Sequence, residues 1–122
     1  MLIKIDFSSE EAIYQQLCNQ IILGIATATL EEGEALPSVR QMADEIGINM
    51  HTVNKAYSIL RQEGFVKMDR RRGAIISMNV DELYALQQLE KDLRKVLAQA
   101  RCRNISRQEL HRVVDEIYDD YE

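Results

Sequence analysis

The sequence predicts a mainly α-helical fold with one small β-hairpin. Three observations lead to this fold class: capping signals that precede apolar residues at helical spacing, a glycine-bounded pair of short strand-like segments between residues 64 and 77, and a C-terminal third with leucines at three- and four-residue steps. At 122 residues the chain can bury one modest core plus an extension. We expect one domain over residues 1–78 and a helical tail over residues 79–122.

The N-terminal region predicts a strand and then a helix. Residues 2–7 alternate enough for a short strand, which could pair with the hairpin or lie along the tail. Residues 8–11 offer a cap with acidic side chains in the first turn, where the helix dipole favours negative charge, so a helix is expected from there to about Thr29. Its buried stripe should consist of Ile13, Leu17, Ile21 and Ile25, with Tyr14 and Cys18 alongside.

Two short helices joined by a glycine turn are predicted after Pro37. Ser38 followed by Gln41 is a capping box, because the hydroxyl and the amide each satisfy an unpaired backbone N–H. The first helix ends at Gly47 and Asn49 caps the second, which predicts a helix-turn-helix. The expected inward faces are Val39, Met42, Ala43 and Ile46 in the first helix and Val53, Ala56, Tyr57 and Leu60 in the second.

The second of these helices should present a polar face to solvent. In a helix-turn-helix the second helix enters the DNA major groove with its N-terminal residues against base edges, so that face must donate and accept hydrogen bonds. The alternative is an ordinary solvated helix face in an all-helical domain. The outward residues are Met50, His51, Asn54, Lys55 and Ser58, with Thr52 beside them.

A short hairpin follows. Residues 65–68 and 74–77 are the expected strands, and the turn between them carries Arg70, Arg71 and Arg72 before Gly73. Three adjacent arginines repel one another and suit a turn that meets an anion, for which the sugar-phosphate backbone is the obvious candidate. A helix-turn-helix followed by a basic hairpin is the arrangement of a winged helix.

The motifs in this order resemble the GntR-type winged helix. The matching stretches, which cover about residues 10–77, are Ile13–Leu17, Leu36–Arg40, Thr52–Tyr57, Glu63–Phe65 and Arg72–Gly73. Because only some 45 residues follow the hairpin, the chain looks like the YtrA-like subfamily of GntR regulators, which carry a short helical dimerisation tail. The resemblance implies a dimeric bacterial transcription factor, usually a repressor, and suggests control of an adjacent transporter operon.

The resemblance also implies a set of DNA-contacting positions. In the family the arginine equivalent to Arg40 contacts DNA, although here it could instead pair with Asp44 at i+4. Met50 and Asn54 stand where relatives carry arginine, so we expect an operator half-site with A·T character beneath His51 and Asn54. The expected DNA-binding residues are Ser38, Arg40, Asn49, Met50, His51, Thr52, Asn54, Lys55, Arg70, Arg71, Arg72 and Gly73.

The tail predicts two amphipathic helices. Asp81 and Glu82 occupy the first turn of one that should end near Asn104, and Ser106 with Glu109 forms a second capping box. So small a hairpin cannot bury both apolar faces alone, and pairing with a second copy would cover them. The alternative is a hairpin folded back on its own domain. The expected dimer interface is Leu83, Leu86, Leu89, Leu93, Leu97, Leu110, Val113, Val114, Ile117, Tyr118 and Tyr121.

Charge and composition bound the function. The net charge is −5, yet residues 38–79 carry seven Lys/Arg and four Asp/Glu, which makes the middle of the chain cationic. Cys18 and Cys102 lie in no metal-ligand or redox motif, and the sequence holds no nucleophile–base pair or phosphate-binding glycine loop, so we expect no metal, no cofactor and no enzymatic activity. No apolar run reaches membrane-spanning length, and a cytoplasmic protein is expected.

The sequence therefore predicts a sequence-specific DNA-binding regulator that acts as a homodimer on a palindromic operator. The alternative is a winged-helix module for protein–protein interaction without specific DNA binding. Salt dependence separates the two, because phosphate contacts weaken steeply as salt rises. The tail is too short to enclose a drug-sized pocket within one protomer, so no small-molecule effector is identified.

Overall fold

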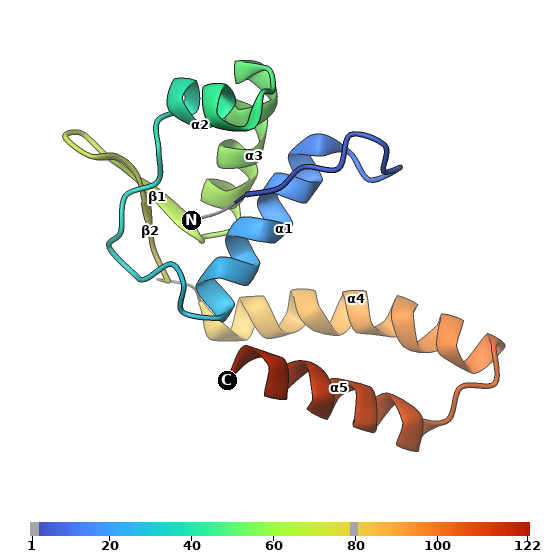
Figure 1. Ribbon diagram of the computed structural model, residues 1–122. Coiled ribbons are helices and arrows are strands. Elements are labelled where there is room, and N and C mark those ends of the chain that lie inside the picture. The colour runs from blue at the N-terminus through green and yellow to red at the C-terminus, as the bar shows by residue number, and fades with distance from the viewer. Residues whose placement is uncertain (1–2, 79–80) are drawn as a thin grey trace. The chain divides into compact units, whose positions relative to one another are not determined.

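The computed structural model describes residues 3–78 and 81–122. Within these residues the chain forms five helices and one two-stranded sheet, and it divides into two compact units, residues 1–79 and 80–122 (Figure 1). The predicted mainly helical fold with one β-hairpin is confirmed. The elements are α1 (Ile13–Ala26), α2 (Val39–Ile46), α3 (Met50–Gln62), β1 (Val66–Asp69), β2 (Gly73–Ile76), α4 (Glu82–Cys102) and α5 (Arg107–Tyr121).

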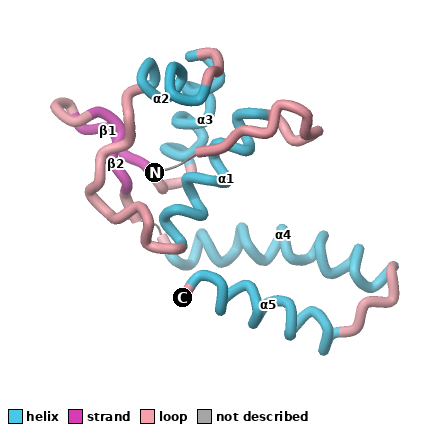
Figure 2. Tube along the Cα trace, in the orientation of Figure 1, coloured by secondary structure: helices cyan, strands magenta, loops and turns pink. Residues whose placement is uncertain are grey.

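The segment before α1 corrects two predictions. Residues 3–6 are loop rather than strand (Figure 2), and α1 begins at Ile13 with no side-chain cap. The backbone N–H groups of Lys4 and Asp6 donate to the side-chain amides of Gln20 and Gln16, 3.0 and 2.9 Å away, so helix α1 supplies the partners that a neighbouring strand would have given. Leu2, the first residue of the predicted strand, lies outside the described residues.

The end of α1 also differs from the prediction. The helix stops at Ala26 rather than near Thr29, because the Thr27 hydroxyl donates to the Leu23 carbonyl at 2.9 Å and Ala28 adopts a left-handed φ of 61°. The predicted stripe is otherwise correct: Leu17 and Ile21 are fully buried, whereas Ile13 and Ile25 are half-buried.

The helix-turn-helix forms as predicted. Ser38 caps α2 in a complete capping box with Gln41, and Gly47 ends the helix in the left-handed region at φ 70°. Asn49 caps α3 through its side chain. A side chain in place of the Gly47 hydrogen would be strained in that conformation, so the glycine fixes the angle at which α3 leaves α2.

The core of the N-terminal unit lies between α1, α2, α3 and the hairpin. Burying these apolar side chains removes surface from water, which is the main source of stability for so small a unit. The buried apolar residues include all four predicted inward residues of α3 and two of the four predicted for α2. The largest fully buried side chains are Leu17, Ile21, Met42, Val53, Leu60, Ile75 and Ile76.

A third segment of the chain pairs with the hairpin, and the sequence analysis did not predict this pairing. β1 and β2 pair in antiparallel register, with Val66 opposite Ile76 and Asp69 opposite Gly73. A short stretch around Ala35 bridges to Ile75 on the other side of β2, with backbone hydrogen bonds of 2.8–2.9 Å. The acidic segment before α2 is therefore hydrogen-bonded to the hairpin, and β2 is the central strand.

The C-terminal unit consists of two antiparallel helices. Asp81 caps α4 by accepting from the N–H groups of Leu83 and Tyr84, and Ser106 caps α5 by accepting from Glu109. The second predicted capping box is only half formed, because the Glu109 carboxylate binds Arg112 at 2.8 Å instead of returning to the cap. None of the helices in the described residues is long and apolar enough to cross a membrane.

Candidate nucleic-acid interface

The first turn of α3 places polar side chains on the surface above a fully buried helix face. Val53 and Leu60 have no exposed surface, so rotation of α3 about its axis would expose core residues. His51 and Asn54 are exposed. Met50, the first residue of α3, is 45% exposed. The buried side of the helix thereby fixes which residues can reach a ligand on the other side.

Two of the predicted DNA-binding residues cap helices with their side chains. The Ser38 hydroxyl accepts from the Gln41 N–H at 3.1 Å, and the Asn49 carboxamide accepts from the His51 N–H at 2.6 Å. A side-chain oxygen used in this way satisfies one of the unpaired donors of a helix end. Thr52 is half-buried, which leaves Met50, His51 and Asn54 as the more accessible residues of this turn.

The Lys55 side chain contacts helix α1. Its ammonium nitrogen lies 3.9 Å from the ring centroid of Tyr14, a cation–π contact between α3 and the first turn of α1. The charge stays on the surface, because Lys55 remains exposed. This arrangement suits a phosphate contact beside the groove better than a contact with a base edge.

A buried tyrosine holds the start of α2 against α3. The Tyr57 hydroxyl donates to the Pro37 carbonyl at 2.8 Å, and burial, with a smaller contribution from Glu45, raises the pKa of this phenol above its usual value. The bond ties the residue just before Ser38 to the middle of α3. Arg40, in the first turn of α2, is thus carried on a fixed helix and its side chain is exposed.

The backbone of the hairpin turn is organised by Asp69. One carboxylate oxygen of Asp69 accepts from the backbone N–H groups of Arg71 and Arg72 at 2.8 and 3.0 Å. These two hydrogen bonds, assisted by the charges of Arg72 and Lys67, lower the pKa of Asp69, which keeps it ionised. Gly73 closes the turn at a left-handed φ of 75°.

The three arginines of the turn are not equivalent. One Arg72 guanidinium nitrogen donates to the Gly33 carbonyl at 3.2 Å, and another lies 3.9 Å from the Asp69 carboxylate. Arg70 and Arg71 are exposed, and within the part of the chain that the structure describes their guanidinium groups have neither a hydrogen bond nor an ion pair. Arg72 therefore braces the turn, whereas the guanidinium groups of Arg70 and Arg71 are available to a ligand.

The site has the composition of a surface that binds a polyanion. Among residues 3–78 and 81–122 no three His, Cys, Asp or Glu side chains are grouped so as to hold a metal ion. The segment that contributes α2, α3 and the hairpin is the cationic part of the chain.

Comparison with known proteins decides the family. Residues 10–76 match the model of the bacterial regulatory proteins of the gntR family. The chain belongs to the GntR family. It is a DNA-binding transcriptional regulator with a winged helix-turn-helix and two further C-terminal helices, not an enzyme.

The similarity extends over almost the whole chain of this GntR-family regulator. It is 31% identical over 119 residues to the HTH-type transcriptional repressor YtrA of Bacillus subtilis, covering 95% of this chain and 92% of that protein. A Listeria monocytogenes structure described as a transcriptional antiterminator superposes with a TM-score of 0.87 at 27% identity, covering 99% and 92% of the two chains. YtrA from Sulfolobus acidocaldarius gives a TM-score of 0.68 at 39% identity over 80% of this chain and 99% of that one. These relatives confirm the predicted YtrA-like resemblance.

Three residues of this surface were missed from the sequence. Tyr14 was placed beside the buried stripe of the first helix, and no contact with this surface was predicted for Gly33 or Asp69. Asp69 had a recognisable signal, since an aspartate at the start of a turn often accepts from backbone N–H groups two or three residues later. The partners of Lys55 and Arg72 are 41 and 39 residues away and carry no local signal.

Proposed function

We propose that this regulator represses transcription by binding a palindromic operator as a homodimer. The observation that carries the proposal is the exposed first turn of α3, which presents polar side chains from a helix whose other face is fully buried. The B. subtilis relative is named a repressor, and that name supports the same direction of control here. Such a protein acts in the cytoplasm, where bacterial DNA is found.

The proposed base readout comes from α3. Asn54 offers the donor–acceptor pair that matches N6 and N7 of adenine, and His51 lies one turn before it. Met50 cannot hydrogen-bond to guanine and suits a thymine methyl group. We therefore propose an operator half-site with A·T base pairs beneath these residues, with Ser38, Asn49, Thr52 and Gly73 positioning the elements rather than reading bases.

The proposed backbone contacts surround this readout. Arg40 on α2, Lys55 beside Tyr14, and Arg70 and Arg71 at the hairpin turn carry exposed positive charges. Phosphate contacts of this kind fix the register of a protein on the duplex without reading its sequence. Their number determines how steeply binding falls with salt.

The proposed homodimer forms through α4 and α5. In a single chain their apolar residues stay uncovered: Leu86 is 64% and Leu93 50% exposed, and the other predicted residues are exposed except for half-buried Leu110. A continuous apolar surface of this kind marks an association site. The proposed interface is the predicted set, Leu83, Leu86, Leu89, Leu93, Leu97, Leu110, Val113, Val114, Ile117, Tyr118 and Tyr121, extended by Val96, which is 52% exposed.

Footprinting on the promoter upstream of the protein's own gene tests the proposal. We expect a protected, two-fold symmetric site whose half-sites lie one helical turn apart, and derepression of this promoter and of the neighbouring operon, which we propose encodes a transporter, when the gene is deleted. An RNA hairpin of the same sequence serves as competitor, because one structural relative is described as an antiterminator. Protection abolished by the RNA, or a single unpaired half-site, would contradict the proposal.

A further inference from the structure

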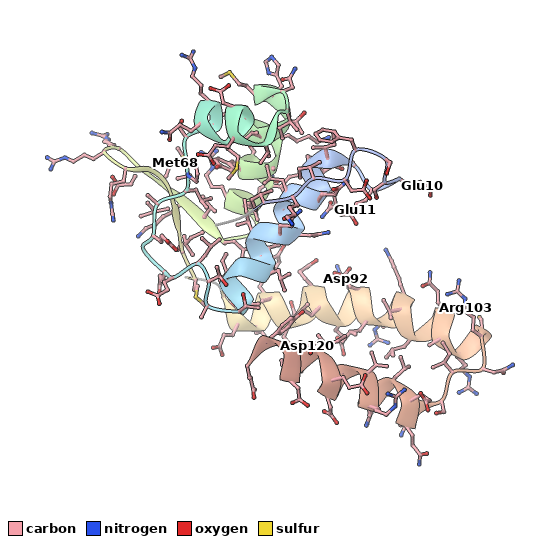
Figure 3. The ribbon with its side chains drawn as sticks, viewed as in Figure 1. Glu10, Glu11, Met68, Asp92, Arg103 and Asp120 are labelled. Atoms are coloured by element: carbon pink, nitrogen blue, oxygen red, sulfur yellow. The ribbon has the colours of Figure 1, made fainter. Side chains whose placement is uncertain are left out.

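The charges of the C-terminal unit are separated along its length. Residues 93–113, which surround the α4–α5 loop, carry six Lys/Arg and one acidic residue, whereas residues 81–92 and 114–122 together carry one lysine and nine acidic residues. Figure 3 shows Arg103 at the loop end of the hairpin and Asp120 at the opposite end. The helical hairpin therefore has a positive end and a negative end.

We infer that the second copy of the chain docks with its α4 antiparallel to α4 of the first, about a two-fold axis that passes Leu93. This geometry deepens the proposed function, because it rests on the homodimer proposed above. In this dimer the uncovered apolar face contacts a second copy of the chain in a single orientation. Two independent features of α4, its charge and the spacing of its leucines, agree on that orientation.

The charge separation favours the antiparallel arrangement. The ion pairs within residues 81–122 join Glu90 to Arg94, and Arg112 to Glu109 and Glu116. The charged side chains at the two ends form no ion pair within these residues; they are Arg101, Arg103, Arg107, Asp119, Asp120 and Glu122. An antiparallel partner brings the positive end of one hairpin beside the negative end of the other. A parallel partner would place like charges together at both ends, which is unfavourable.

The helix dipole also favours a positively charged partner at the acidic end of α5. Asp119 and Asp120 lie in the last turn of the helix, where no basic residue is present and where the helix dipole disfavours negative charge. Arginines from a second hairpin would offset that repulsion. Salt should weaken the contact, since exposed charges are screened beyond about 10 Å at 0.1 M ionic strength.

The leucine spacing of α4 is symmetric about the same point. Leu89, Leu93 and Leu97 are separated by four residues on either side of Leu93, so reversing the helix places Leu89 of one copy opposite Leu97 of the other. The next position on each side is three residues further, at Leu86 and Ala100. Ala100 is buried, but Ile105, whose N–H donates to the Ala100 carbonyl at 3.0 Å, is exposed there and can meet Leu86.

The antiparallel geometry also sets the distance between the two points at which α4 begins. Each unit is joined to the start of α4, and Glu82 is eleven residues from the proposed axis. At 1.5 Å per residue the two joints lie about 33 Å apart. Half-sites on DNA are one helical turn, about 34 Å, apart, which is comparable with the distance between the two joints. A parallel dimer would bring both joints to one end.

Disulfide trapping distinguishes the two orientations. In a background with Cys102→Ser, which removes the exposed native thiol, single cysteines replace Leu89, Leu93 or Leu97. Oxidation should link Leu93→Cys to itself, whereas Leu89→Cys and Leu97→Cys alone should stay unlinked, because their twins lie about 12 Å apart along the axis. A mixture of the Leu89→Cys and Leu97→Cys chains should give the mixed dimer. Gln88→Cys, away from the stripe, is the control for random collisions.

Each outcome is decisive when the oligomeric state is measured on the same samples. A dimer in which Leu89→Cys and Leu97→Cys each link to themselves is parallel and overturns this inference while leaving the homodimer intact. A dimer that links at none of these sites also overturns it, because the leucine stripe is then not the interface. A chain that sediments as a monomer overturns the proposed homodimer itself.

A distance measurement on the unsubstituted chain gives an independent check. A spin label attached at exposed Cys102, with Cys18 buried and unreactive, should report a distance near 30 Å between the two labels, because the two positions are about 27 Å apart along an antiparallel pair. Distances centred below about 20 Å would place both loop ends together and overturn the inference.

Discussion

The hairpin arginines allow a sharp prediction, because Arg72 is braced against Gly33 and Asp69, whereas the guanidinium groups of Arg70 and Arg71 have no partner in the described chain. Replacing Arg70 with alanine should remove a phosphate contact, and replacing Arg72 should loosen the turn that presents it. The two variants carry the same change in charge. They should nevertheless differ in how their DNA affinity responds to salt.

The expected magnitudes follow from counterion release. Each phosphate contact contributes about 0.9 to the slope of log affinity against log salt, so Arg70→Ala in both protomers should make the slope less steep by about 1.8. Between 50 and 200 mM salt, that change corresponds to roughly a 12-fold difference in relative affinity. Arg72→Ala should leave the slope unchanged. Losing its exposed hydrogen bond to Gly33, about 1 kcal/mol or less, should weaken binding by up to roughly fivefold per protomer at every salt concentration.

Fluorescence anisotropy with a labelled promoter duplex measures both quantities. Asp69→Ala is the matched control: it makes the protein more positive but removes the carboxylate that accepts from two backbone N–H groups, so we expect weaker binding despite the favourable charge. If Arg72→Ala lowers the slope as much as Arg70→Ala does, then Arg72 contacts DNA directly. If Asp69→Ala binds more tightly, the turn does not depend on its carboxylate.

Three further predictions concern other parts of the N-terminal unit. Asn54→Ala should reduce discrimination for A·T over G·C at one half-site position by about 1–3 kcal/mol, measured by competition between duplexes that differ at that base pair; equal loss on both duplexes would assign Asn54 to the backbone. Tyr14→Leu and Lys55→Met should show a coupling of about 0.5–1 kcal/mol in a double-mutant cycle of unfolding, and additive effects would mean that the cation–π contact contributes nothing. Burial raises the pKa of the Cys18 thiol from 9.0 to about 11, so the folded state favours the neutral thiol. The free energy of unfolding should therefore fall as pH rises from about 9 to 11. Cys18→Ala should flatten that fall, and an unchanged pH profile of the unfolding free energy would refute the assignment of this effect to Cys18.

Local signals in the sequence determined the recognition elements. The Ser38–Gln41 capping box, the left-handed Gly47 and the Asn49 cap each act within a few residues, so α2 begins and ends, and α3 begins, where those residues are. The buried face of α3 follows from its period alone. The hairpin strands were predicted to within one residue, because Gly64 and Gly73 both require a left-handed backbone.

Tertiary structure decided which of the charged and polar side chains remain available. The residues around Lys4 looked like a strand, but the amides of Gln16 and Gln20 satisfy their backbone across 10 to 16 residues, so no strand forms. Arg72 looked like one of three equivalent arginines, until the fold brought the Gly33 carbonyl within 3.2 Å. Composition and periodicity report what a residue can bind, whereas the path of the chain determines what lies next to it.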